Sequence, residues 1–314
     1  MRWLGLLVLG AAFVPHPDRE PRRPQRVQAD TVTALAVDPS SDRVAWGRLD
    51  GRFLVAARRT WESTPSIQWE QPAPPTAIAW SPDGAILAIA DAEGNLLLSR
   101  PPFHKPPRRL QGHPSCIHGM AFTVEGTTFL TCGQDHRVRL WRTSDGELLT
   151  TWGPFGSPLF ALAASPRGPQ FAVGGLDGKI RLCQLSDGVV THELAHEQGA
   201  VLSLALSHDG KYLASAGQDC SVRLWDVATG EPRRRLDGHG DPVVHVSFLG
   251  SSRRLISLSE SGLIVVWDLA TGEALHAERF PGATHCGTLV GQATFLAGTS
   301  TGRIVAWDIP PSVR

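Results

Sequence analysis

One short segment recurs along the chain and decides its fold. It reads RVRLWRTSDGE at residues 137–147, SVRLWDVATGE at 221–231 and LIVVWDLATGE at 263–273, and IVAWDIP at 304–310 repeats its first half. Aligned on the tryptophan and continued backwards along the chain, the segment defines seven equivalent positions spaced 40 to 43 residues apart: Ala56, Ser99, Trp141, Cys183, Trp225, Trp267 and Trp307. A regular period of this length indicates a repeat architecture with one supersecondary unit in each copy.

Each copy contains several alternating apolar runs separated by turn residues. In the fifth copy these runs are VLSLALS at 201–207, YLASAG at 212–217, SVRLWDV at 221–227 and EPRRRL at 231–236, with Asp, Gly or Thr between them. Such residues suit tight hairpin turns, so each copy is expected to form a four-stranded antiparallel meander. One such sheet cannot bury both faces, but seven around an axis can. The sequence therefore predicts an all-β, seven-bladed β-propeller over residues 20–310.

The repeats resemble those of the WD40 (WD-repeat) family of β-propellers. The resemblance is carried by the Trp-Asp ends, by Gly112-His113 and Gly238-His239, and by Ser81-Pro82-Asp83-Gly84. It implies a hydrogen-bonded relay within a blade: a histidine before the first strand, a Ser or Thr in the second, an Asp in the next turn and the tryptophan of the third. The members present here are His113, Thr131, Asp135 and Trp141 in the third copy, His196, Ser215, Asp219 and Trp225 in the fifth, and His239, Ser257 and Trp267 in the sixth, where Ser261 replaces the Asp.

The two ends of the chain suggest how the ring closes. The seventh copy ends after its third strand, and residues 20–30 precede the first copy as residues 231–237 precede the sixth. We therefore expect this N-terminal strand to complete the seventh blade, with residues 15–19 as a linker and 311–314 as a C-terminal tail. Residues 1–14, MRWLGLLVLGAAFV, have the shape of a signal peptide and fall short of the roughly 20 apolar residues of a membrane-spanning helix.

The chain's location and redox environment are left open by opposing signals. The N-terminal segment favours export or a cell-envelope location. Five widely spaced cysteines without a C-x-x-C motif are expected to be free thiols, which favours the cytoplasm.

Charge gives little direction to a functional prediction. The 30 Lys and Arg residues balance 30 Asp and Glu residues, so no specific nucleic-acid binding is expected. No stable membrane span is expected either, because the apolar run at residues 1–14 is too short. Arginines cluster on the expected outer strands at Arg22-Arg23-Arg26, Arg108-Arg109 and Arg233-Arg234-Arg235, where charge discourages aggregation through exposed strand edges. Binding of nucleic acid or anionic lipid through these outer strands is an alternative interpretation.

No motif indicates catalysis, a metal or a cofactor. Residues 298–302 spell G-x-S-x-G, but they are expected to join two strands, whereas the nucleophile elbow of α/β-hydrolases is a strand-to-helix turn. The first strands, which line a propeller's channel, offer only His118, His245 and His285 as polar metal-binding or catalytic types. His245 is a candidate channel residue, or else a core histidine, because the matching positions in the other copies are small: Ala34, Ala77, Gly119, Ala161, Ser203 and Gly287.

The resemblance also implies a docking rim, at the position just before the second turn's Asp. The candidate interaction residues are Leu49, Gln134, Leu176, Gln218, Glu260 and Ser300, with Ala92 in the second copy. Apolar anchors beside hydrogen-bonding groups suit a protein partner. We predict a non-catalytic scaffold that binds a protein or peptide, as a monomeric propeller within a complex. The alternative is a propeller enzyme or sensor that binds a small ligand in the central channel.

Overall fold

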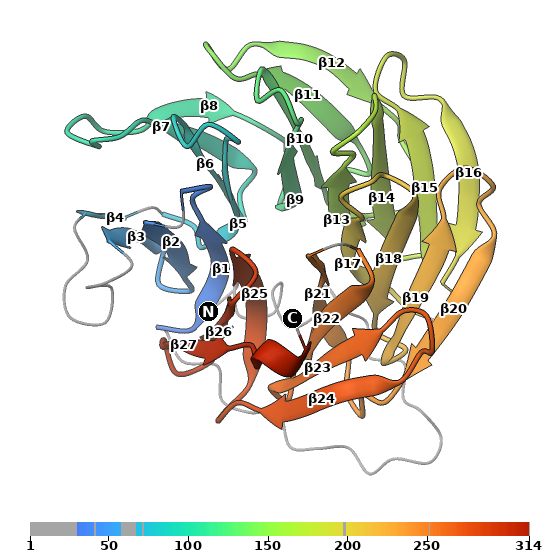
Figure 1. The fold of residues 1–314 in the computed structure, drawn as a ribbon. Coiled ribbons are helices and arrows are strands. Elements are labelled where there is room, and N and C mark those ends of the chain that lie inside the picture. The colour runs from blue at the N-terminus through green and yellow to red at the C-terminus, as the bar shows by residue number, and fades with distance from the viewer. Residues whose placement is uncertain are drawn as a thin grey trace.

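The computed structural model describes residues 30–40, 42–57, 72–196, 199–250 and 252–313, and the backbone of residues 67–70. Seven antiparallel sheets surround a central axis, and the chain passes through them in sequence (Figure 1). Six sheets have four strands, and the seventh has three within the described part of the chain. The predicted seven-bladed β-propeller is confirmed.

We number the blades 1 to 7 in chain order, each with its innermost strand first. Blade 1 contains β1 (Val32–Val37), β2 (Arg43–Arg48), β3 (Arg52–Ala57) and β4 (Ile67–Glu70). Blade 2 contains β5 (Pro75–Trp80), β6 (Leu87–Asp91), β7 (Asn95–Ser99) and β8 (Arg108–Gln111). Blade 3 contains β9 (Ile117–Phe122), β10 (Thr128–Gly133), β11 (Val138–Arg142) and β12 (Leu148–Trp152). Blades 4 and 5 contain β13 (Leu159–Ala164), β14 (Gln170–Gly175), β15 (Lys179–Gln184) and β16 (Val190–Ala195); and β17 (Val201–Leu206), β18 (Tyr212–Gly217), β19 (Ser221–Asp226) and β20 (Pro232–Asp237). Blades 6 and 7 contain β21 (Val243–Leu249), β22 (Arg254–Ser259), β23 (Leu263–Asp268) and β24 (Ala274–Arg279); and β25 (Thr284–Val290), β26 (Thr294–Thr299) and β27 (Ile304–Asp308).

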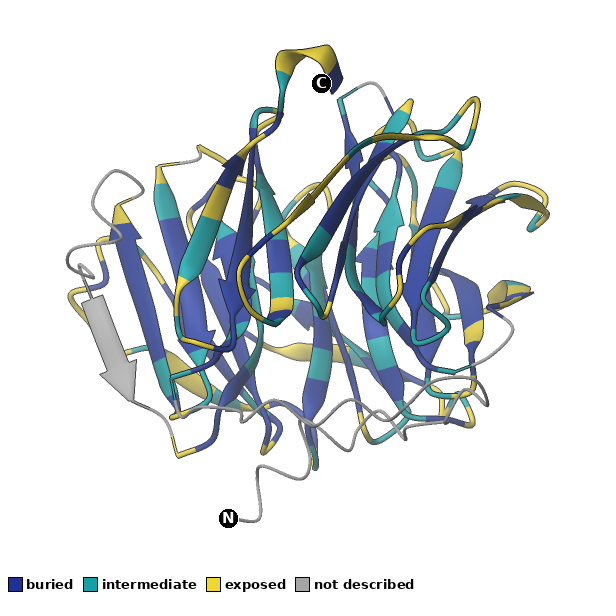
Figure 2. Cartoon of the chain, turned by 90° about the horizontal axis from the view of Figure 1, so that it is seen from below, coloured by how far each residue is buried: buried dark blue, intermediate teal, exposed yellow. Residues whose placement is uncertain are grey.

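The apolar core lies between neighbouring blades. One buried cluster joins Ile180 and Leu194 of blade 4 to Val201, Leu213 and Trp225 of blade 5. The middle strands are buried along most of their length, while exposed residues gather on the outer strands and turns (Figure 2). This arrangement follows from the sequence pattern, because a sheet packed on both faces needs apolar residues at nearly every position.

Blade 4, which lacks the third-strand tryptophan, packs against an aromatic residue of its neighbour instead. In blade 3, Trp141 pairs across the sheet with Phe129 and stacks on it. In blade 4, Cys183 takes that position opposite Phe171, and Trp152 from the outer strand of blade 3 stacks on Phe171 instead, at 5.2 Å between ring centroids. The ring from the neighbouring blade therefore compensates for the missing indole.

The described ends of the chain meet at blades 1 and 7. The Thr31 hydroxyl donates to the Ser300 carbonyl at 2.9 Å, and β1 packs against β25 and β26. The closing strand predicted for residues 20–30 lies outside the described residues except for Asp30, whose carbonyl oxygen lies close to Gly302 at the turn before β27. The signal-peptide prediction for residues 1–14 also falls outside them.

The other end of the chain packs on the opposite face of the ring. A short 3-10 helix, η1 (Pro311–Val313), follows β27, and the side chain of Val313 is buried with Leu249 and Trp307. Part of the tail predicted at 311–314 is thus ordered against the propeller. In the portion of the chain that the structure describes, no helix has the length and apolarity to span a membrane.

Candidate binding face

Blade 3 contains a complete buried relay. The Trp141 indole N–H donates to Thr131 Oγ1 at 2.9 Å, Thr131 Oγ1 lies 2.8 Å from His113 Nε2, and His113 Nδ1 lies 2.8 Å from Asp135 Oδ1. Arg139 adds an ion pair to Asp135 at 2.5 Å. Burial raises the pKa of Asp135, but the hydrogen bonds from His113 and Arg139 outweigh burial and hold it at about 2.

The relay of blade 3 has the residue types of a hydrolase triad but not its accessibility. Thr131 is fully buried, and its hydroxyl oxygen already accepts the Trp141 N–H. A nucleophile must reach a substrate, so this Thr-His-Asp arrangement serves to satisfy buried polar groups.

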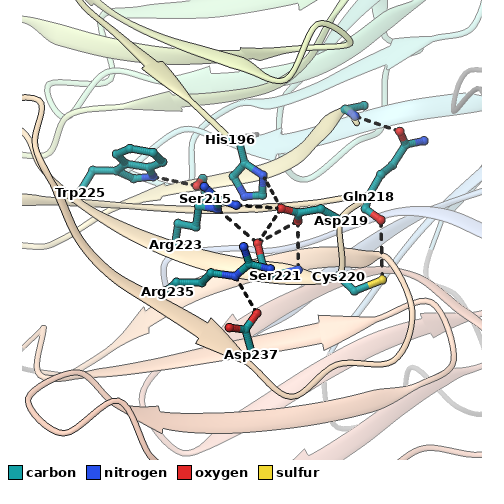
Figure 3. A network of polar contacts seen from close by, with 11 residues as sticks. His196, Ser215, Gln218, Asp219, Cys220, Ser221, Arg223, Trp225, Arg235 and Asp237 are labelled. Atoms are coloured by element: carbon teal, nitrogen blue, oxygen red, sulfur yellow. Dashed lines mark hydrogen bonds and ion pairs between the residues drawn. The ribbon is translucent and has the colours of Figure 1, made fainter. Parts of the chain in front are cut away.

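The relay predicted for blade 5 is interrupted at His196, which corrects the expectation of a second complete set. Trp225 donates to Ser215 Oγ at 2.8 Å, but neither ring nitrogen of His196 has a hydrogen-bond partner, and its Nδ1 lies 3.5 Å from Asp219 (Figure 3). Asp219 accepts hydrogen bonds from both the hydroxyl and the amide of Ser221, whereas the equivalent Arg137 of blade 3 donates only its amide to Asp135.

Blade 6 has three relay members, and its relay lacks the carboxylate that accepts from the histidine in blade 3. His239 Nε2 lies 2.6 Å from Ser257 Oγ, which also accepts the Trp267 N–H at 2.8 Å. His239 Nδ1 is buried without a hydrogen-bond partner, because Ser261 stands in the Asp position and lies against Ser259 instead. Burial lowers the pKa of His239 to about 4, although Asp241 opposes this effect.

The rim residues are held at one end of the ring by the same backbone contact in every blade. Each amide donates to a carbonyl just before the innermost strand of its own blade, at 2.8 to 3.0 Å. The donors and acceptors are Leu49 to Thr31, Ala92 to Pro74, Gln134 to Cys116, Leu176 to Pro158, Gln218 to Ala200, Glu260 to Pro242 and Ser300 to Ala283. Leu49, Leu176 and Gln218 are half-buried, Gln134 and Glu260 are exposed, and Ala92 and Ser300 are buried.

A β-bulge lies beside the rim in the innermost strand of every blade. The register between the first two strands shifts by one residue at this point. The bulged residues are Thr33, Thr76, His118, Phe160, Leu202, Val244 and His285, of which His285 is exposed and the others are half-buried. A bulge re-aims the extra side chain. The strand patterns alone gave no sign of it, because a bulge is defined by the pairing of two strands and not by the sequence of one.

One part of this bulged ring forms an aromatic cluster. The imidazole of His118 stacks on Phe160 at 4.4 Å between centroids, and its Nε2 lies 3.3 Å from the Gln134 side-chain oxygen. The rim residue of blade 3 thus contacts the bulged residue of the same blade, which in turn contacts that of blade 4.

Comparison with known proteins agrees with this architecture. The family model described as "WD domain, G-beta repeat" matches four segments, at residues 104–142, 146–183, 188–226 and 230–268. The chain belongs to the WD40-repeat family. It is similar to WD repeat-containing protein 1 of Gallus gallus, with 31% identity over 116 residues. That alignment covers 36% of this chain and 19% of the chicken protein, so the similarity extends over about a fifth of that relative's length.

Within this WD40 propeller, His245 lies between blades rather than in the channel. Its ring packs against Phe295 of β26 at 5.4 Å between centroids, and its Nε2 lies 2.5 Å from Ser247 Oγ. Burial lowers its pKa to about 4. The bulge also corrects the alignment in blade 7: the residue in register with His245 is Cys286, not Gly287.

The G-x-S-x-G motif at residues 298–302 connects β26 to β27. The Ser300 amide donates to Ala283, and its side chain is buried, so the strand-to-helix geometry of a nucleophile elbow does not occur at this motif. Among the described residues, no three His, Cys, Asp or Glu side chains lie close enough together to hold a metal ion.

Proposed function

We propose that this WD40 propeller is a non-catalytic scaffold whose rim binds a protein or peptide partner. The observation that carries the proposal is that the rim residues have the same backbone contact in every blade but different side chains. The rim amides are held alike in all seven blades, yet the accessible side chains are apolar at Leu49 and Leu176 and polar at Gln134, Gln218 and Glu260. A rigid ring with an irregular chemical pattern suits recognition of one defined partner surface.

The polar side chains that could support catalysis have structural contacts. The three relays keep their hydroxyls buried against tryptophan, and His245 is packed between blades 6 and 7. These contacts favour binding over chemistry, although the stack of His118 on Phe160 beside the rim residue Gln134 keeps a small-ligand site as the alternative.

The arginines of blade 5 do not favour the electrostatic alternative. Arg233 pairs with Asp226 at 2.6 Å, Arg235 pairs with Asp237 at 2.8 Å, and Arg234 donates to the carbonyls of Ala270 and Thr271. These guanidinium groups form ion pairs and hydrogen bonds within the propeller, which leaves little net attraction for a polyanion.

The test is affinity capture with a matched pair of double variants. Leu49→Ser with Leu176→Ser removes the apolar rim anchors, and Leu149→Ser with Val189→Ser removes exposed apolar residues from the outer strand and turn of blades 3 and 4. We expect a defined protein captured by the wild type to be lost with the rim variant and retained with the control. Equal capture by both variants would contradict the rim proposal, and equal melting temperatures would show that all three proteins are folded.

A further inference from the structure

The connection between the last two strands of blade 2 differs from its counterparts. In blades 3 to 6 this connection has five residues, with a glycine at positive φ and at least one acidic residue, as in Asp145-Gly146-Glu147. In blade 2 it has eight residues, Arg100–Pro107, with no glycine and no acidic residue. It carries Arg100, His104 and Lys105, and Arg108 follows it directly. This basic loop projects outward from the ring between β7 and β8 (Figure 1).

The basic loop is anchored at two points. Phe103 adopts a φ of 64°, is 8% exposed and meets Trp80 edge-on at 5.9 Å between centroids. The guanidinium of Arg43 lies 4.6 Å from the centre of the same Trp80 ring. Arg100 donates to the Ser144 carbonyl of blade 3 at 2.7 Å. Burial of Phe103 holds a bulky residue in the left-handed region, which isolated chains rarely populate, so packing determines the loop's shape.

The charges beyond the anchor face solvent. His104, Lys105 and Arg108 are exposed, and within the described ranges the structure records no ion pair to any of them. In the turn of blade 3 that Arg100 contacts, the recorded ion pairs of Asp145 and Glu147 are with Arg142. Blade 2 therefore differs from blade 5, where the arginines of the outer strand are compensated by neighbouring groups.

We propose that the basic loop and β8 bind an acidic, extended segment of a partner protein. β8 is the last strand of its sheet, and among the described strands none pairs with its outer edge. A peptide can pair its backbone with such an edge while its carboxylates meet Lys105 and Arg108. This combination of an edge and a local charge favours a peptide over a lipid or nucleic-acid surface, since only a peptide uses both. The surface is separate from the rim.

The test uses two labelled decapeptides of equal charge in fluorescence anisotropy. One alternates Glu with Val and can pair as a strand; the other alternates Glu with Pro and lacks half of the backbone donors. We expect the Glu-Val peptide to bind the full chain at least tenfold more tightly than the Glu-Pro peptide. Lys105→Glu with Arg108→Glu should weaken binding at least tenfold, and Lys105→Ala with Arg108→Ala should weaken it less.

The matched control is Lys211→Glu with Arg253→Glu, which makes the same change in net charge at exposed positions of blades 5 and 6. It should bind the Glu-Val peptide as the wild type does, and so should the rim variant Leu49→Ser with Leu176→Ser. Equal loss in the charge control, equal affinity for the two peptides, or binding only to anionic vesicles or single-stranded DNA would overturn the proposal. Loss in the rim variant would place the peptide on the rim instead.

Discussion

His239 should make the propeller less stable in mild acid. Its Nε2 contacts Ser257, its Nδ1 has no partner, and burial holds its pKa at about 4, below the ordinary 6.5. Because the unfolded chain binds a proton near pH 6.5 and the folded chain does not, the stability contributed by neutral His239 is full above pH 6.5 and falls as the pH drops toward 4.

The magnitude follows from the two pKa values. Between pH 7.5 and pH 5.0, a group with an unfolded pKa of 6.5 and a folded pKa of about 4 loses about 2 kcal/mol of stability. Almost all of this loss falls below pH 6.5, where the slope approaches about 1.4 kcal/mol per pH unit. His239→Gln removes the titrating group and keeps an amide that can reach the Ser257 hydroxyl. The variant should therefore lose about 2 kcal/mol less than the wild type over this pH interval.

The assay is urea unfolding followed by tryptophan fluorescence at pH 7.5 and 5.0. The comparison uses the pH difference within each protein, so any cost of the substitution at neutral pH cancels. His104→Gln makes the same substitution at an exposed position of blade 2 and is the matched control. If His239→Gln and the wild type lost the same stability between the two pH values, the assignment of acid sensitivity to this buried ring would be refuted.

Three further predictions concern the blades and their closure. Cys220 has a φ of 64° at a turn position that glycine occupies in blades 1, 2, 4, 6 and 7. Because glycine adopts this backbone conformation without strain, Cys220→Gly should raise the free energy of unfolding by about 1 kcal/mol, and Gly178→Cys should lower it. Equal urea midpoints for these variants and the wild type would contradict this prediction. Asp135→Asn should lower the free energy of unfolding by about 3 kcal/mol at pH 7, because Arg139 and His113 lose their carboxylate partner. In acid-unfolding curves, the stability difference between this variant and the wild type should shrink as the pH falls from 3.8 toward 2. Deleting residues 1–29 should lower the melting temperature, because β27 has no outer neighbour among the described strands; an unchanged melting temperature would show that the segment does not complete blade 7.

The blade count and strand order were predictable from local signals. The tryptophan spacing, the Asp-Gly turns and the alternating apolar runs each act over a few residues, and together they define seven similar units. The order of residues around the rim follows from the same period, because every rim residue lies seven positions before the aligned third-strand position of its blade, whether or not that position is tryptophan. The Cys183 and Ser99 positions also predicted that these blades lack an indole in the third strand.

Which side chains meet was decided by the tertiary structure. Trp152 compensates for Cys183 from a neighbouring blade, a contact between separate sheets that no local pattern encodes. His196 has the residue type of His113 but lies 3.5 Å from its carboxylate partner Asp219, which also accepts the Ser221 hydroxyl, whereas His113 lies 2.8 Å from Asp135. The bulge in β21 accompanies the contact of His245 with Phe295 of blade 7, which no pattern within one strand encodes. The sequence by itself therefore determined the repeated unit and its number, while packing between units decided each unit's polar contacts, since those depend on positions that only the closed ring defines.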